Sequence, residues 1–362
     1  MKKKLVALLL VMCLVMTMAT ACGSSSGSTT TADNTTTSFT DSAGRAVEVP
    51  AKITRIVPSG ALAQIALFAL APEMFVGLSS KWDTTAEQYI DTKYLDLPVL
   101  GQFYGQGDLN LEEIAKVDPQ IIIDIGESKS TIVEDMDGIQ EQVGIPTVHI
   151  EATMDTMAEA YRTLGKLLGK EKEAEVLAKY CETVNSDTQK IIAKVGESGK
   201  TKLVYCTGEN GLSVLANGSF HAEVIDTLSN NVAVVNDISS KGTGNPVDME
   251  QLMLWDPDVI IFAPGSIYST VATNEAWQNL KAIKNGTYYE VPNGPYNWMG
   301  SPPSVNRLMG MIWMTQLLYP DQAQYDGYKK ASEYYKLFYH TDLTQDQYNK
   351  LVANSLGKTE KK

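Results

Sequence analysis

The chain has 362 residues, enough to bury the separate cores of two α/β lobes. Its composition, with 44% hydrophobic and 20% charged residues, is ordinary for a soluble globular protein. The formal net charge of −13 argues against nucleic acid as a partner and against a polybasic membrane-binding patch.

The first 22 residues have the pattern of an export signal rather than of a folded element. Three lysines at positions 2–4 precede an apolar stretch over 5–18, and small residues then lead to Cys22. The apolar stretch is too short and wrongly flanked for a membrane-spanning helix, so a retained anchor helix is the weaker alternative. The pattern therefore predicts a signal peptide over 1–21.

A tract of Gly, Ser, Thr and other small polar residues follows, over 23–38. Such a tract cannot build a core and behaves as a flexible tether. We expect a flexible linker over 22–38 and a folded body from Phe39 onward.

Strands alternate with helices in the first lobe, expected over 39–170. A hairpin is expected over 40–50. Further elements follow it, with strands over 53–57, 75–78, 121–125 and 148–150 and helices over 61–71 and 131–143. This alternation is typical of a mainly parallel sheet.

Two consecutive helices, over 154–168 and 171–195, then interrupt the alternation. In the second, apolar residues recur at spacings of three, one and four, which marks one face of an α-helix. No Pro or Gly interrupts it, and a helix of this length spans about 37 Å. We expect a rigid connector between two lobes.

The alternation resumes in a second lobe, over 196–362. Strands are expected over 203–205, 232–235, 259–262 and 288–291, and helices over 222–228, 248–255, 276–283 and 305–318. A charged, Tyr-rich helical tail over 322–355 is expected to pack on this lobe. The predicted fold class is α/β, with two Rossmann-like lobes of mainly parallel sheet joined by one long rigid α-helix.

One sequence pattern occurs in both lobes, 138 positions apart. Each copy has an N-capping residue, Asn110 or Asp248, then a short amphipathic helix, Asp-Pro and an all-apolar strand. Glu113 and Gln251 stand where a capping box has its second member. The repeat predicts two lobes of similar build with a working site in the cleft between them.

Glu112 and Glu250 lie one place before the capping-box partner, so the box does not explain them. The helix dipole favours a carboxylate at this position by about 0.3–1 kcal/mol. Because a Glu stands at the matched place in both lobes, we consider a shared role in binding an external partner as well supported as this structural explanation.

The chain resembles the class III extracytoplasmic substrate-binding proteins of ABC importers, the family for iron–siderophores, haem and cobalamin. The resemblance rests on the segments 40–57, 110–123 and 248–261, and the helix over 171–195 matches the rigid inter-lobe helix of that family. It covers essentially all of 39–318. It implies a binding protein without a cofactor of its own, and we expect a monomer.

In this family one surface Glu of each lobe docks onto arginines of the permease dimer, which by position implies Glu112 and Glu250. Charge-assisted carboxylate–guanidinium pairs are strong and bidentate, and two of them fix orientation as well as affinity. The end of the signal resembles that of a bacterial lipoprotein, although Ala19 stands where the family usually has Leu. That likeness implies lipidation of Cys22 and an anchor on the outer face of the cytoplasmic membrane.

The ligand crevice of open α/β sheets lies beyond the carboxyl ends of the strands. Polar and aromatic residues of the loops there are candidate ligand contacts, namely Ser59, Trp82, Tyr104, Tyr268, Tyr296, Trp298 and Arg307. Aromatic walls suit a large, partly apolar ligand, but burial in a core is the alternative for any one aromatic. The loop over 296–303, which contains Gly and two Pro, is favoured as a wall of the cleft. Arg307 either turns toward the crevice or is a solvated surface residue.

The chain has only four arginines, whereas anionic ferric catecholates and carboxylates usually need several fixed cations. This scarcity favours a neutral or cationic metal chelate, with an iron–siderophore ahead of haem or cobalamin. The alternative is molybdate or tungstate, an oxyanion that backbone N–H groups at a helix N-terminus can hold. His221 is a weak candidate for a metal ligand, because a lone His is more often packed or capped.

The rival class is an enzyme on the same scaffold. A hydrolase needs a nucleophile elbow or a catalytic triad. A nucleotide enzyme needs a Gly-rich phosphate-binding loop, but the glycines at 105–107 and 242–244 lack the spacing of such a loop. Binding without chemistry is therefore the stronger interpretation. Cys181 and Cys206 could form a disulfide, but their positions on a buried helix stripe and at a strand end favour buried free thiols.

Overall fold

A computed structural model describes residues 35–103 and 109–356 of the chain. The predicted signal peptide, Cys22, Tyr104 and most of the predicted linker lie outside the described residues. From Thr36 onward the chain belongs to one compact unit. Within the described ranges, no helix combines the length and the apolar character needed to cross a membrane.

The folded body begins at Thr36, three residues before the predicted start. β1 (Thr36–Thr40) pairs antiparallel with β2 (Ala46–Pro50), so residues 36–38 belong to a hairpin rather than to the linker. The Asp41 carboxylate accepts the N–H groups of Ala43 and Arg45 at 3.0 and 2.9 Å and thereby holds the turn. Because the turn is held in this way, residues 36–38 pair with β2 and form a strand, although their polar composition predicted a flexible linker.

The first lobe is built on a parallel sheet in the order β3 (Ile56–Pro58), β4 (Ile121–Gly126), β5 (Thr147–Glu151). Every residue of β4 is buried, because helices cover both faces of the sheet. The helices of this lobe include α2 (Ala61–Leu70), α3 (Thr92–Leu95), α4 (Leu111–Val117) and α5 (Ile132–Val143). The strand predicted over 75–78 is reduced to isolated bridges at Phe75 and Leu78.

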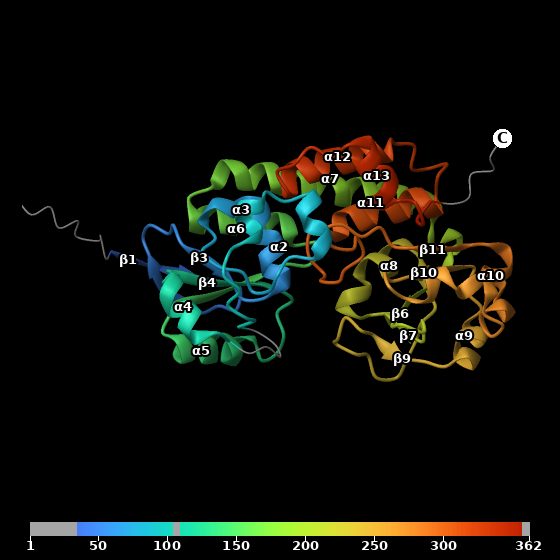
Figure 1. Cartoon of the computed structure of the whole chain (residues 1–362), viewed down its shortest axis with the longest axis horizontal. Coiled ribbons are helices and arrows are strands. Elements are labelled where there is room, and N and C mark those ends of the chain that lie inside the picture. The colour runs from blue at the N-terminus through green and yellow to red at the C-terminus, as the bar shows by residue number, and fades with distance from the viewer. Residues whose placement is uncertain (1–34, 104–108, 357–362) are drawn as a thin grey trace, which may run out of the picture. The chain divides into compact units, whose positions relative to one another are not determined.

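The sheet of the second lobe has the order β11 (Tyr288–Glu290), β10 (Val259–Phe262), β6 (Lys202–Thr207), β7 (Ser213–Val214), β9 (Asn245–Pro246). β8 (Asn230–Asn231) also pairs with β6. The helices here are α8 (Glu223–Leu228), α9 (Met249–Trp255), α10 (Lys281–Asn285) and α11 (Arg307–Leu318). The fold class predicted from the sequence is confirmed (Figure 1).

The strand predicted over 232–235 is wrong. Asn231 turns the chain away from the sheet, since its side chain donates to Asp226 at 2.7 Å and accepts the N–H of Ala233 at 3.2 Å. As a result Val234 is exposed.

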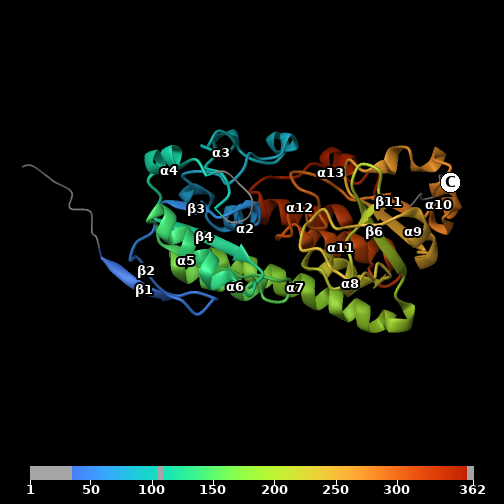
Figure 2. The same ribbon diagram turned by 90° about the horizontal axis from the view of Figure 1, so that it is seen from below.

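The long helix α7 (Glu171–Val195) has the predicted bounds. It follows α6 (Met157–Leu168), and Gly165 allows the two helices to approach closely, because a Cβ there would lie 2.5 Å from the Cβ of Ala174. α7 packs against α6 and α2 of the first lobe and against α11 of the second (Figure 2). The connector is therefore packed against both lobes.

The helical tail, predicted to pack on the second lobe, contacts both lobes. α12 (Gly327–Phe338) packs against α11 and α2, and α13 (Gln345–Leu351) follows it. The ring of Tyr335 lies 5.2 Å from that of Tyr89, and His340 Nε2 lies 3.1 Å from the carbonyl oxygen of Phe68.

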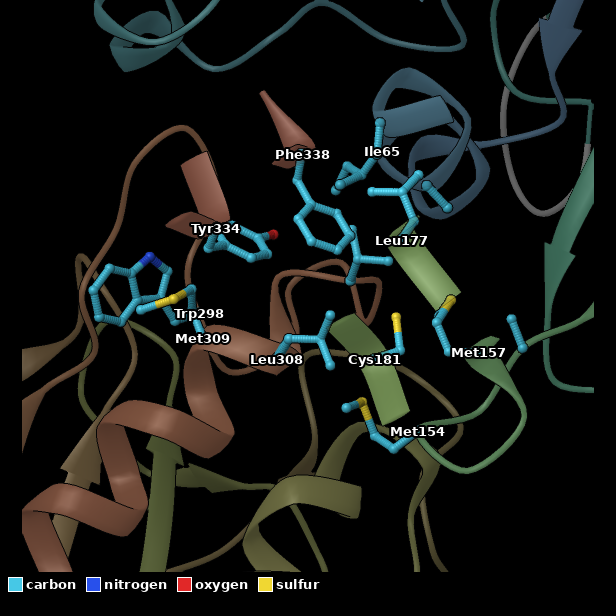
Figure 3. Close-up of a cluster of buried hydrophobic side chains, with 14 of the residues drawn as sticks. Ile65, Met154, Met157, Leu177, Cys181, Trp298, Leu308, Met309, Tyr334 and Phe338 are labelled. Carbon is cyan, nitrogen blue, oxygen red and sulfur yellow. The ribbon is translucent and has the colours of Figure 1, made fainter. Parts of the chain in front are cut away.

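One continuous hydrophobic cluster joins the lobes (Figure 3). It includes Ile65 of α2, Leu177 of α7, Leu308 of α11 and Phe338 of α12, all buried. Because such a core is close-packed, the two lobes share a rigid base on this side.

Cys181 and Cys206 are free, buried thiols, as the sequence favoured. They belong to different hydrophobic clusters. Burial raises the pKa of both thiols, which keeps them protonated and unreactive.

Candidate functional site

A cavity of about 230 Å³ lies between loops of the two lobes. The first lobe contributes Ser59, Gly60 to Ala63, Gln102, Asp124 to Glu127 and Lys129, and the second contributes Phe220, His221, Ser240, Pro302 and Pro303. Ser59 and Gly126 stand at the carboxyl ends of β3 and β4, where the crevice of an open α/β sheet is expected. The cavity thus occupies the position predicted for the binding site.

The N-terminus of α2 forms one wall of the cavity. Its N-cap is Gly60, which offers no side chain to the first turn, and that turn contains no acidic residue. The first N–H groups of a helix have no partner within the helix and carry the positive end of its dipole. This wall therefore presents main-chain donors suited to an oxygen-rich or anionic ligand.

A chain of hydrogen bonds runs from the cavity into the first lobe. Ser59 donates to Asp124, and the other oxygen of Asp124 lies 2.7 Å from Nδ1 of His149. Nε2 of His149 lies 3.1 Å from Oγ of Ser128. Asp124 and His149 are register partners on β4 and β5, so the sheet itself brings them together. The pairing supplies the partners that a buried carboxylate needs.

Ser128, His149 and Asp124 are bonded in the order used by serine hydrolases, which sequence reasoning did not anticipate. His149 is fully buried, and Ser128 does not line the cavity. The hydroxyl that would act as nucleophile therefore does not face a solute in the cavity. A polar residue within an apolar run could have revealed the network, since Asp124 stands between Ile123 and Ile125 and His149 between Val148 and Ile150.

Arg307 lies behind the cavity wall and is fully buried, which excludes the predicted alternative of a solvated surface residue. Its Nη1 lies 2.6 Å from Oε2 of Glu223 and donates to the carbonyl of Phe220 at 3.2 Å. Its guanidinium also lies 4.6 Å from the centre of the Phe220 ring. Burial lowers the pKa of Arg307, and Glu223 opposes that shift. Arg307 thus positions Phe220, which forms the aromatic wall.

Glu223 also joins the lobes at this point. While Oε2 pairs with Arg307, Oε1 accepts the N–H of Met154 at 2.9 Å, just after β5. Beside the cavity, Ser304 Oγ donates to the carbonyl of Leu62 at 2.9 Å. These contacts hold the wall of the second lobe against α2 and β5 of the first.

The predicted aromatic contacts that the structure describes do not line this cavity. Trp298 is 2% exposed in the shared core, and the ring of Trp82 packs 5.9 Å from that of Tyr296. Tyr268 packs 5.7 Å from the ring of Tyr288. Burial of Trp82 and Trp298 in the core removes their apolar area from water. The loop over 296–303 does reach the cavity, but through Pro302 and Pro303.

His221 lines the cavity, and its Nδ1 lies 3.4 Å from the carbonyl oxygen of Gly300. Burial, and to a lesser degree the charge of Arg307, lower the pKa of His221, so the ring is neutral near pH 7. In the described parts of the chain, no group of three His, Cys, Asp or Glu is placed to hold a metal ion. His221 is therefore better suited to hydrogen bonding than to a protein-held metal centre.

The repeated element has the same geometry in both lobes. Asn110 accepts the N–H of Glu113 at 3.1 Å, and Asp248 accepts that of Gln251 at 2.8 Å, as the capping pattern predicts. The reciprocal side-chain bond of a capping box is not formed in either helix, so only half of each box is present within the described residues. Glu112 and Glu250 are both exposed.

A model of the periplasmic binding protein family matches residues 79–295, which is more than half of the chain. The chain therefore belongs to the periplasmic binding protein family. The family, the bilobal fold and the cavity between the lobes together define the chain as a bilobal binding protein.

Individual proteins of known description are similar to this chain. An Fe(3+)-citrate-binding protein of Bacillus subtilis (strain 168) is 28% identical over 188 residues, which cover 50% of this chain and 56% of that protein. The chain thus spans little more than half the length of this curated relative. The structure of an ABC transporter solute binding protein from Sulfurospirillum deleyianum has a TM-score of 0.80 at 28% identity and covers 87% of this chain and 99% of that one. A periplasmic solute binding protein from Veillonella parvula has a TM-score of 0.71 at 26% identity, with 90% and 99% covered. All three are described as binding proteins.

Proposed function

We propose that the protein is the substrate-binding component of an ABC importer, which captures a metal chelate between its lobes and delivers it to a membrane permease dimer. The observation that carries this proposal is the cavity at the carboxyl ends of β3 and β4, because both lobes wall it. The likeness to binding proteins of transport systems supports delivery rather than chemistry.

Within this proposal, an iron–siderophore or a related ferric chelate is the favoured ligand. The cavity of about 230 Å³ is smaller than the roughly 300–1,000 Å³ typical of ligand pockets, which disfavours haem and cobalamin and, among ferric chelates, favours the smaller ones. Its wall combines the Phe220 ring with polar groups of Ser59, Gln102 and His221. The iron–citrate relative supports a ferric chelate, although citrate is one of the carboxylates that the scarcity of arginine disfavours.

The second candidate is an oxyanion such as molybdate or tungstate. The uncapped first turn of α2 favours it, since free N–H groups at a helix N-terminus hold anions without arginine. The carboxylates of Asp124 and Glu127 in the same wall oppose it. A ferric chelate with an oxygen-rich, anionic edge fits both features, because its edge can meet the amides while its body contacts the rest of the wall.

Delivery also requires a permease and a membrane. We assign permease docking to Glu112 and Glu250, which are exposed at matched places on the two lobes. The proposal also includes export of the chain and lipidation of Cys22, which would anchor it on the outer face of the cytoplasmic membrane. The polar tract after Cys22 would then act as the tether.

The test is a titration of the full chain with ferric citrate, a ferric hydroxamate, cobalamin and molybdate, followed by calorimetry and thermal unfolding. A ligand that binds only the folded state raises Tm in proportion to the logarithm of its concentration. We expect one-to-one binding of a ferric chelate without turnover. Binding of molybdate alone would select the second candidate, and chemical conversion of any solute would overturn the binding function.

A further inference from the structure

We infer that the two docking faces are unequal, and that α9 of the second lobe forms the main contact with the permease through Glu250, Met253 and Leu254. The inference rests on the proposed function, because it concerns the surface by which the protein would meet its permease. Its basis is a position-by-position comparison of α4 and α9.

The two helices are matched controls for each other. Both have seven residues, both begin after an N-cap that accepts the N–H of the third helical residue, and both end at an Asp in the left-handed region. The φ values of those residues, Asp118 and Asp256, are 46° and 44°. The N-cap residues differ in ψ, 81° at Asn110 and 173° at Asp248, but the helices match in length and in their C-terminal geometry, so we compare their faces side chain by side chain.

The two glutamates differ in charge environment. On α4, Lys116 Nζ lies 3.0 Å from Oε1 of Glu112 and 2.7 Å from Oε1 of Glu113. The residue of α9 that matches Lys116 is Leu254, and no cation of the described chain pairs with Glu250. An incoming arginine would have to compete with Lys116 for Glu112, whereas it would find Glu250 free.

The two faces also differ in apolar surface. Leu254 is 73% exposed and Met253 44% exposed, and they stand four and three residues after Glu250. Residues at these spacings are neighbours on one helix face. The matched residues on α4 are Lys116 and Ala115. Leu111 is 53% exposed, but it directly precedes Glu112 and so does not lie on the same row.

A free carboxylate beside two exposed apolar side chains fits a partner with an arginine next to an apolar patch. Apolar contacts around such a charge pair would exclude water from it, as the surroundings of a binding hot spot do. A second copy of this chain does not fit, because the net charge of −13 and the carboxylate on the same face would place like charges together. The permease is therefore the occupant to which the chemistry points.

The experiment measures the Kd of the full chain for its permease dimer in lipid nanodiscs. Glu250→Gln should weaken binding about tenfold or more, the loss expected for a charge-assisted bond. Leu254→Ala should weaken it about tenfold, since most of a buried leucine side chain is lost. Glu112→Gln should weaken it only about threefold, and Lys116→Ala should tighten it about twofold by freeing Glu112.

Leu111→Ala is the matched control for Leu254→Ala and should leave the Kd unchanged. All five positions are exposed, so each variant should keep the wild-type circular dichroism and Tm. Equal losses for Glu112→Gln and Glu250→Gln, with no loss for Leu254→Ala, would overturn the inequality and leave the proposed function intact. No change for either glutamate would overturn the docking assignment itself, and a wild-type chain that does not bind the permease would overturn both.

Discussion

The two lobes contribute different chemistry to the same cavity. The first lobe offers main-chain donors at Gly60 to Ala63 and a hydrogen-bonded carboxylate at Asp124. The second offers side chains, Phe220 and His221, backed by Arg307. Donors on a helix terminus are fixed by the backbone, whereas a side-chain wall can vary in shape. Under the proposed function, we expect the first lobe to select the charge of the ligand and the second to select its shape.

The largest effect is expected when the support of the second-lobe wall is removed. Arg307→Met leaves Glu223 without its cation and should lower the free energy of unfolding by about 3 kcal/mol, because Glu223 is only partly exposed. Urea unfolding measures the change. The double variant Arg307→Met with Glu223→Gln should regain most of it, and a loss below about 1 kcal/mol in the single variant would contradict the structural role of the pair.

A smaller effect is expected from the wall itself. Phe220→Ala removes the aromatic surface of the cavity and should weaken binding of the identified solute by about 1–2 kcal/mol in calorimetry. Tyr268→Ala is the control, because Tyr268 was a sequence candidate but packs on Tyr288 outside the cavity. Equal losses in both variants would show that shape recognition is not confined to the Phe220 wall.

The smallest effect concerns pH. The pKa of His221 is lowered from its usual value near 6.5, so below that pH the unfolded chain binds more protons than the folded one. His221 therefore reduces stability as the pH falls below about 6.5, until the lowered folded pKa is passed. Thermal unfolding of His221→Asn should show a flatter pH dependence between pH 7 and 5. An unchanged profile would place the acid sensitivity elsewhere.

Features governed by local periodicity were predictable from the sequence. The apolar stripe of α7 gave its bounds, and the repeated capping pattern gave two helices of the same geometry. Features that depend on contacts between residues far apart in the sequence were not predictable. Trp298 lies in a loop and Phe220 begins the short 3-10 helix Phe220–Ala222, and only the packed structure decides that the first enters the core and the second the cavity wall. Arg307 was placed near the pocket, but its burial depends on Glu223, 84 residues earlier.

The central claim, that a solute binds between the lobes against the first turn of α2, is tested most directly at Gly60. A Cβ at Gly60 would have no described atom within 4 Å, so we expect Gly60→Asp and Gly60→Asn both to fold. Aspartate would cap the free N–H groups and repel an anionic edge, whereas asparagine would cap without charge. Calorimetry with ferric citrate, a ferric hydroxamate and molybdate should show that the solute bound by the wild type loses at least about tenfold in affinity for Gly60→Asp, or about 1.4 kcal/mol. A smaller loss for Gly60→Asn would mark an anionic ligand and equal losses a neutral one, while wild-type affinity in both variants would contradict the claim.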